Sequence, residues 1–331
     1  MNGRIEQVAE LLGPLAERDV PIGPLTTYRV GGRAALLARI ETLADLRTLG
    51  EAIRAVEVPV LIVGRGSNVL VADRGFPGLA VVLGEFAGAI DVEADERPDG
   101  TRHVVAGGAV SLPVLARRTV AAGLTGFEWA VGVPGSVGGA VRMNAGGHGS
   151  DIAAALVEVR VFDLRSGHDG VVPASEIGLR FRGSDLGDHH VVVDARLRLR
   201  PGDRAAGEAE LAEIVRWRRE NQPGGQNAGS VFVNPVPGAV AAGELVDQLG
   251  LRGLRVGSAE VSPKHANFIQ ADEGGSADDV YALMRIVRER VREATGVLLR
   301  SEIRLVGFDE ALTDRSEVRQ AQSIVATKWR H

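Results

Sequence analysis

Hydrophobic residues recur along this chain with two spacings. Intervals of three to four residues predict amphipathic helices at residues 1–20, 41–58, 111–124, 208–220 and 276–296. Short apolar or alternating runs predict strands at residues 58–63, 156–164, 190–199 and 298–307. Ser111 and Ser276 precede two of the helices, and we expect them to act as N-caps. A polar turn at Asp99 and Gly100 between β-rich runs predicts a hairpin.

The length of 331 residues exceeds what one hydrophobic core usually organises, so two or three domains are expected. Residues 201–210 combine proline, glycine and charges, which predicts a linker that closes the middle domain. Residues 309–331 form a polar tail to which the sequence assigns no chemistry.

The composition is typical of a folded protein, with 45% apolar and 24% charged residues. The absence of cysteine excludes disulfides and thiolate metal sites, and it agrees with a reducing compartment. A formal net charge of −5 argues against a nucleic-acid partner, and no apolar run reaches the ~20 residues of a membrane helix. The N-terminal segment lacks a signal-peptide core. We therefore expect a cytoplasmic protein with neither a nucleic-acid nor a membrane partner.

The seven histidines lack the spacing of metal ligands. The adjacent His189 and His190 are expected on opposite sides of a strand, because side chains alternate there. No metal site is predicted.

Glycine concentrates in two segments that follow apolar runs. In the first, Gly64, Gly66, Ser67 and Asn68 follow the run at 58–63. Such a turn can direct consecutive backbone N–H groups at phosphate oxygens. It lacks the lysine of a Walker loop and the third glycine of the dinucleotide fingerprint. A tight turn between two strands is the alternative interpretation.

The second segment has nine glycines from Gly123 to Gly149 and almost no charge. An apolar segment of this kind is predicted to be buried, and its backbone amides then need acceptors. A large anionic cofactor with several rings would supply them, whereas a structural loop without a ligand is the alternative.

Three polar residues are candidates for chemistry, and each has an ordinary alternative. Ser230 has no acid–histidine pair beside it in the sequence, so it suits a proton donor better than a nucleophile. It could equally satisfy the backbone of its own turn. Arg182 could be a solvated arginine, and Glu302 could pair with Arg300 or Arg304 across a strand.

Several motifs between residues 26 and 307 occur together in one order. They are TTYRVGG (26–32), GRGSNVLV (64–71), GFEWAVGVPGSVGGAVRMNAG (126–146), FRGS (181–184), NQP (221–223), NAGSVFVNP (227–235), AGELVDQLGLRG (242–253), HANFI (265–269) and SEIRLVG (301–307). This ordered set resembles the UDP-N-acetylenolpyruvoylglucosamine reductase family. The uninterrupted HANF region is similar to the shorter-loop branch of that family.

The resemblance implies an α+β fold. It would comprise a two-part FAD-binding region of the vanillyl-alcohol-oxidase type, with subdomains at residues 1–78 and 79–200. A C-terminal α/β substrate domain would follow at residues 201–308, and a polar tail at residues 309–331. The implied reaction reduces UDP-N-acetylglucosamine enolpyruvate to UDP-N-acetylmuramate in peptidoglycan precursor synthesis. NADPH would be the hydride donor and FAD a non-covalent cofactor, in a protein expected to be a monomer.

The matched motifs also imply roles for individual residues. Catalytic roles fall on Arg182, Ser230 as the proton donor, and Glu302. Cofactor contacts are implied for Tyr28, Arg65, Gly66, Ser67, Asn68, Gly108, Pro134, Gly135, Ser136, Gly138, Asn144 and Ala145. Substrate contacts are implied for Arg219, Asn234, Arg252 and His265. The chain departs from the family pattern at Phe181, where the family has tyrosine, and at Val233, where it has lysine.

Two other functions stay open from the sequence. One is an FAD-dependent oxidase of the same fold that acts on another small molecule. The other is a nucleotide-sugar-binding module without turnover, which would have no need of Arg182, Ser230 and Glu302 together.

Overall fold

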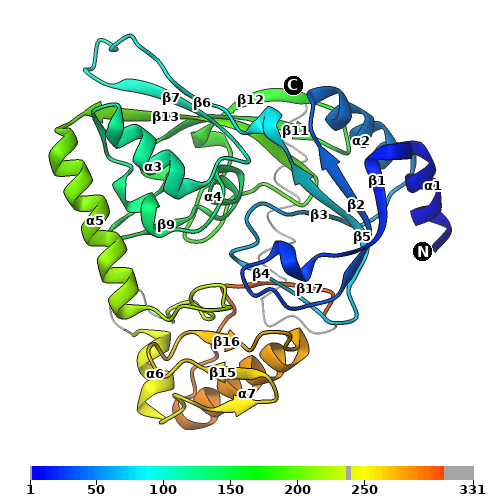
Figure 1. Ribbon diagram of the computed structural model, residues 1–331, viewed down its shortest axis with the longest axis vertical. Helices are drawn as coiled ribbons and strands as arrows, with labels where there is room; N and C mark the ends of the chain where they lie inside the picture. Colours follow the sequence, from blue (N-terminus) through cyan, green and yellow to red (C-terminus); the bar gives the residue numbers. More distant parts are fainter. Residues whose placement is uncertain (1, 236–239, 309–331) are drawn as a thin grey trace.

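The computed structural model describes residues 2–235 and 240–308, which form three packed units (Figure 1). The first unit contains a four-stranded sheet with the order β1-β2-β5-β3, in which β1 is antiparallel to β2 and the other pairs are parallel. Its strands are β1 (Ala16–Pro21), β2 (Arg33–Ile40), β3 (Val60–Ile62) and β5 (Phe76–Leu83). Helices α1 (Asn2–Leu12) and α2 (Leu43–Ala55) share one apolar core with this sheet.

Helix α1 is shorter than the sequence pattern predicts. It ends at Leu12 rather than near residue 20, because Gly13 has a φ of +53° and Pro14 follows. A left-handed glycine and a proline are common where a helix stops. The following residues from Ala16 instead form the edge strand β1.

The second unit is built on a sheet with the order β12-β11-β13-β7-β6, and β8 pairs with the end of β13. Its strands are β6 (Ile90–Val92), β7 (Arg102–Gly107), β8 (Leu124–Thr125), β11 (Leu156–Asp163), β12 (Asp169–Pro173) and β13 (His190–Pro201). Helices α3 (Leu112–Ala121) and α4 (Val137–Met143) pack on one face with the small hairpin of β9 (Gly146–Gly147) and β10 (Ser150–Asp151). Ser111 occupies the N-cap position of α3, but its side chain makes no capping hydrogen bond.

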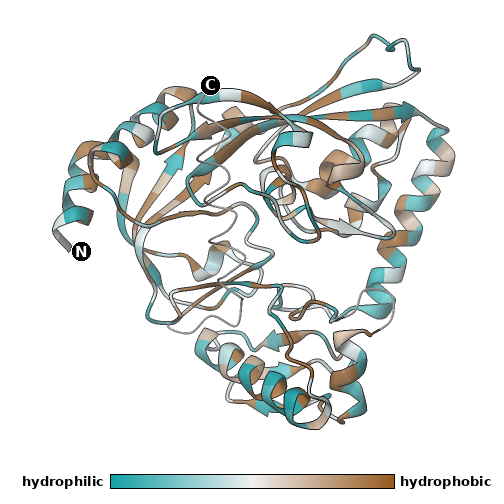
Figure 2. Ribbon diagram, turned by 180° about the vertical axis from the view of Figure 1, so that it is seen from behind, coloured by the Kyte–Doolittle hydropathy of each residue, from teal (hydrophilic) through white to brown (hydrophobic). Residues whose placement is uncertain are grey.

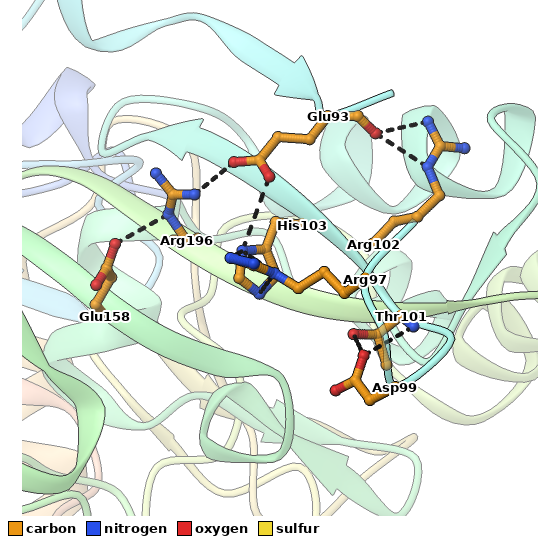
Figure 3. Close-up of polar contacts among 8 residues, drawn as sticks. All are labelled: Glu93, Arg97, Asp99, Thr101, Arg102, His103, Glu158 and Arg196. Carbon is orange, nitrogen blue, oxygen red and sulfur yellow. Dashed lines mark hydrogen bonds and ion pairs between the residues drawn. The ribbon is translucent and has the colours of Figure 1, made fainter. Parts of the chain in front are cut away.

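The predicted hairpin at Asp99 and Gly100 is confirmed, since β6 pairs antiparallel with β7. Figure 3 shows a polar ladder on this part of the sheet. The Nε of Arg196 on β13 lies 2.9 Å from the carboxylate of Glu158 on β11, and its Nη1 lies 2.5 Å from Glu93. These pairs join strands to one another, so we assign the ladder a structural role.

The third unit contains a three-stranded antiparallel sheet and the helices around it (Figure 1). Its elements are α6 (Ala242–Gln248), β14 (Arg255–Val256), β15 (Ala259–Val261), β16 (Ile269–Ala271) and α7 (Ala277–Thr295). The preceding helix α5 (Arg204–Asn221) packs on the core of the second unit through Leu211 and Ile214. The predicted cap of α7 is confirmed, because Ser276 Oγ accepts a hydrogen bond from Asp279 N at 3.1 Å. Helices α5 and α7 carry both apolar and polar residues along their length (Figure 2).

The linker predicted at residues 201–210 is wrong. Helix α5 already begins at Arg204, with Asp203 as its N-cap accepting a hydrogen bond from Ala206 N at 2.8 Å. The helix runs from the second unit to the third (Figure 1). A helix therefore makes the connection for which a linker was expected.

The last described strand returns to the first part of the chain. Strand β17 (Arg304–Val306) lies parallel to β4 (Val69–Val71), which directly follows the first glycine-rich turn. The domain limits at residues 78, 200 and 308 stay a prediction. Strand β5 crosses the first of these limits and pairs within the first sheet.

Candidate active site

Residues 64–68, here called the cofactor loop, have unpaired backbone donors. In the part of the chain that the structure describes, none of their five amide N–H groups has a protein acceptor. Gly66 has a φ of +60°, and a Cβ there would lie 2.2 Å from the carbonyl oxygen of Leu25. Only glycine fits that position without displacing backbone. Free N–H groups in a tight turn form an anion-binding nest, so the site fits a phosphate group.

The two glycine-rich segments meet at a cavity of about 190 Å³. Its lining includes Gly64 and Arg65 from the cofactor loop, and Gly108, Ser136 and Gly138 opposite. A Cβ on Gly64 would lie 2.3 Å from Ser136 Oγ, which shows how closely the segments approach. The predicted cofactor residues Arg65, Gly108, Ser136 and Gly138 therefore share one space.

Backbone N–H groups of the second glycine-rich segment find their acceptors within the protein. The N–H groups of Val137 and Gly138 donate to Val110 O and Gly108 O, both at 2.9 Å, and that of Gly139 donates to Ser136 Oγ at 3.3 Å. The expectation that a cofactor supplies the acceptors is wrong for these groups. Their glycines serve close packing instead.

Other predicted cofactor residues lie within the protein framework. The Tyr28 hydroxyl donates to Ile269 O at 3.1 Å, deep in the core shared with the third unit, and burial raises the pKa of Tyr28. Asn144 ends α4 in the left-handed conformation, and its side chain bonds to Asp151 at 3.1 Å. Ala145 packs against the core of the second unit.

Gly135, which follows Pro134, lies close to the cofactor loop. Its carbonyl oxygen accepts a hydrogen bond from Leu112 N at 2.9 Å. A Cβ on Gly135 would lie 3.7 Å from Ser67 Oγ. These predicted contacts thus adjoin the loop.

Arg182 and Glu302 meet although 120 positions separate them (302 − 182). The Nε of Arg182 lies 2.6 Å from Oε1 of Glu302, and Nη1 of Arg182 donates to Gly146 O at 3.1 Å. Both side chains are largely buried. Burial raises the pKa of Glu302, and the Arg182 guanidinium partly opposes that rise. Arg304, which was considered as a cross-strand partner of Glu302, instead pairs with Asp188 at 2.7 Å.

Ser230 lies on a segment that runs beside Glu302. Phe232 and Ser301 form an antiparallel bridge, and Glu302 N donates to Val231 O at 2.8 Å. The backbone therefore brings the Ser230 segment next to the ion pair. Together we call Arg182, Ser230 and Glu302 the polar corner.

Asn267 fixes the segment that carries Ser230. Its side chain donates to Phe232 O at 2.8 Å and accepts from Phe232 N at 3.0 Å, while its carbonyl accepts from Val231 N at 2.8 Å. Asn267 is not among the predicted site residues, although it belongs to the HANFI motif at 265–269. An asparagine two positions after the selected His265 was the available signal.

Asn68 connects the cofactor loop to the polar corner. Its Nδ2 donates to Glu302 O at 3.1 Å, and its carbonyl accepts from Arg304 N at 3.0 Å. Its predicted role in cofactor binding thus coincides with a contact that positions Glu302.

The predicted substrate residues lie in or next to the third unit. The Asn234 side chain accepts from Ala242 N at 3.0 Å, and His265 Nδ1 accepts from Asn267 N at 3.2 Å. Burial, and then Arg252, lower the pKa of His265. Arg252 is engaged with Asp247.

Arg219 is exposed on α5, whereas its neighbour Arg218 is half-buried. Burial alone lowers the pKa of Arg218, and no carboxylate pairs with it among the described residues. An unneutralised, partly desolvated arginine is a better anion ligand than an exposed one. Helical spacing alone could not distinguish the two neighbours, so Arg218 was missed.

The expectation for His189 and His190 is wrong. Their ring centroids lie 4.0 Å apart, because β13 begins at His190 and His189 belongs to the preceding turn. Ligand atoms of both histidines and Asp163 lie within 4.8 Å of one another. His190 Nδ1 already accepts from Gly187 N at 2.8 Å, and Asp163 accepts from Arg165 N at 2.9 Å. We assign no metal to this cluster.

Among the described residues, no helix combines the length and the apolar character needed to cross a bilayer.

Two family models match separate parts of the chain. The model described as an FAD binding domain matches residues 34–168, which include the cofactor loop and most of the cavity lining, apart from His190 and Val192. The model described as the C-terminal domain of UDP-N-acetylenolpyruvoylglucosamine reductase matches residues 221–306. The fold and the site thus define an FAD-containing oxidoreductase.

Relatives agree over most of the chain. The UDP-N-acetylenolpyruvoylglucosamine reductase of Acidiphilium cryptum is 43% identical over 88% of this chain and 91% of its own. The corresponding reductase of Heliobacterium modesticaldum is 42% identical over 87% of this chain and 89% of its own. The crystal structure of the corresponding reductase from Thermus caldophilus is 36% identical, with a TM-score of 0.73 over 88% of this chain and 98% of that one. The chain belongs to the UDP-N-acetylenolpyruvoylglucosamine reductase family, and the predicted resemblance is confirmed.

Proposed function

We propose that this protein reduces UDP-N-acetylglucosamine enolpyruvate to UDP-N-acetylmuramate, with NADPH as the hydride donor. The observation that carries the proposal is the Arg182–Glu302 ion pair, with Nε and Oε1 2.6 Å apart, beside the Ser230 segment and next to the cofactor loop. When bound, FAD supplies the means to accept a hydride from NADPH and to deliver it to the enolpyruvyl double bond. The free amides of the cofactor loop would hold its diphosphate.

Addition of hydride to the methylene carbon of the enolpyruvyl group places negative charge on the carbon beside the carboxylate. Arg182 disperses this charge, because its guanidinium is planar and always charged. Its contact with Gly146 O fixes the guanidinium from the second unit. In this role Arg182 acts on the developing enolate rather than on the sugar.

The same carbon must then gain a proton, and Ser230 donates that of its hydroxyl. This transfer requires the serine oxygen to come within about 3 Å of the carbon when substrate is bound. Asn267 holds the following backbone at three points, which fixes the approach of Ser230. Glu302, whose pKa is raised by burial, orients the substrate carboxyl group or returns a proton to Ser230.

The substrate diphosphate needs cations from the third unit. Arg252, His265 and Asn234 stay the predicted contacts. We prefer Arg218 to Arg219 because Arg218 is half-buried, whereas Arg219 is exposed. The cytoplasmic location and the monomeric state stay predictions.

Anaerobic half-reactions test this proposal. The purified protein should show a flavin spectrum that NADPH bleaches and that UDP-N-acetylglucosamine enolpyruvate restores. An oxidase would instead be reoxidised rapidly by oxygen and not by the UDP-sugar. A protein that binds FAD but oxidises no NADPH, with or without the UDP-sugar, would contradict the proposed reaction.

A further inference from the structure

The wall of the cofactor cavity holds an arginine that is not among the predicted site residues. Arg142 lies on α4, one turn after Gly138 and Gly139, and all three line the cavity with Gly64 and Arg65. Residues three and four positions apart share one side of a helix. Helix α4 therefore presents two positions without side chains and one guanidinium to the same space.

The charge around Arg142 is not balanced. Both Arg142 and Arg304 pair with a single oxygen, Oδ1 of Asp188. One carboxylate thus serves two guanidinium groups, and Arg65 adds a third cation to the cavity. The described lining of the cavity contains no Asp or Glu.

The Arg142 side chain is largely buried, with 20% of its surface exposed, whereas half of the Asp188 side chain is exposed. Burial, and then the charge of Arg304, lower the pKa of Arg142 to about 10. Although burial raises the pKa of Asp188, Arg304 and Arg142 together hold it at about 2. Arg142 and Asp188 therefore both stay charged at neutral pH, while two guanidinium groups share the one carboxylate.

We infer that Arg142 binds the diphosphate of FAD, together with the free amides of the cofactor loop. The diphosphate fits better than the flavin ring, because it brings negative charge to a cavity that has cations, the free N–H groups of Gly64 and Arg65 and no described carboxylate. Asp188 is the counter-ion that holds the Arg142 guanidinium when no phosphate engages it. The inference rests on FAD binding in this cavity.

Titration of the apoprotein with FAD and with riboflavin tests the inference, because riboflavin lacks the diphosphate. Arg142→Gln should weaken FAD binding about 10- to 100-fold, the usual range for a hydrogen bond to a charged group. Riboflavin affinity should stay within about twofold. Arg142→Lys should recover part of the FAD affinity, since it restores the charge without the planar fork.

Arg160→Gln is the matched control. Arg160 pairs with Asp169 through two hydrogen bonds of 2.7 and 2.8 Å in the same unit, and it is absent from the cavity lining. Its loss should leave the affinities for both flavins unchanged. The thermal unfolding temperature of each variant separates a binding effect from a general loss of structure.

Several outcomes would overturn the inference. They are an equal loss of FAD and riboflavin affinity in Arg142→Gln, a shift of the midpoint potential of the bound flavin, or no loss of FAD affinity. If Arg142→Gln does not fold, Asp188→Asn gives a second test, because it frees Arg142 and should leave FAD affinity equal or tighter. A weaker FAD affinity in Asp188→Asn would contradict the inference. Failure of the wild-type protein to bind FAD would instead contradict the proposed function.

Discussion

The cofactor loop and the polar corner adjoin each other, yet they are built in opposite ways. The loop consists of five consecutive residues that offer backbone N–H groups, so its function depends on chain conformation. The corner consists of side chains from three distant segments, so its function depends on chemical groups held by long-range pairing. Substitutions in the loop should therefore change FAD affinity. Substitutions in the corner should change turnover while FAD stays bound.

Glu302→Gln should give the largest effect. Removal of one electrostatic contact that acts in the transition state typically costs ~10²–10³ in turnover. We expect a steady-state rate lowered by this factor, with the FAD affinity of the wild-type protein. Glu260→Gln is the control, because Glu260 pairs with Arg255 on a hairpin of the third unit. Loss of FAD affinity in Glu302→Gln would break the distinction between loop and corner.

The pH profile sharpens the role of Glu302. Its pKa lies above the ordinary value, so the protonated form is present below the raised pKa and is lost as pH rises through it. If the protonated form is the active one, wild-type turnover should fall along this alkaline limb. Glu302→Gln should lack the limb, since an amide does not titrate. An unchanged limb in the variant would assign it to another group.

Gly66→Ala should act on the loop. The φ of +60° costs a side chain about 1–2 kcal/mol, and the new Cβ would also lie 2.2 Å from Leu25 O. The loop must move, and we expect FAD affinity to fall by at least about tenfold in a fluorescence titration.

Gly100→Ala provides the matched control for Gly66→Ala. Gly100 has a φ of +75°, but the nearest atom to its new Cβ is 3.8 Å away. This variant should lose stability by a similar strain energy and keep its FAD affinity. Equal FAD affinities in the two variants would show that the loop does not bind the cofactor.

Asn68→Ala should give the smallest effect, and this effect should fall on both FAD affinity and turnover. Its side chain contributes one hydrogen bond to Glu302 O, which is typically worth about 0.5–1.5 kcal/mol. Because Asn68 belongs to both regions, FAD affinity and turnover should each fall by a few-fold. A change in only one of the two quantities would show that the regions act independently at this residue.

Local features of the fold were predictable from the sequence, because their causes lie within a few residues. Helix α7 has its apolar spacing and its Ser276 cap, and the hairpin has its polar turn at Asp99 and Gly100. Composition alone gave a wrong linker prediction at residues 201–210, because Asp203 caps a helix within this polar stretch.

The cofactor site was predicted only in part. The cofactor loop has the free donors that its glycines indicated, whereas the second glycine-rich segment bonds to the protein and gives shape to the cavity. The sequence shows where glycine is, but not which amides find acceptors. That depends on the bridge between Ser111 and Ser136 and on the approach of Gly108 to Gly138.

The polar corner could not be assembled from the sequence pattern. Arg182, Ser230 and Glu302 were selected by family resemblance, and their proximity depends on the pairing of β17 with β4 and on the bridge from Phe232 to Ser301. Arg142 was not selected because its importance comes from Asp188, which lies 46 positions away (188 − 142).

The reduced Ser230→Ala variant tests the central claim most directly, when it is mixed anaerobically with UDP-N-acetylglucosamine enolpyruvate in a stopped-flow spectrometer. Loss of the proton donor should slow product formation by ~10²-fold or more, while reduction of the variant by NADPH stays at the wild-type rate. Ser166→Ala, in a surface turn beside Asp163, should match the wild-type protein in both steps. Product formation by Ser230→Ala at the wild-type rate would contradict the account.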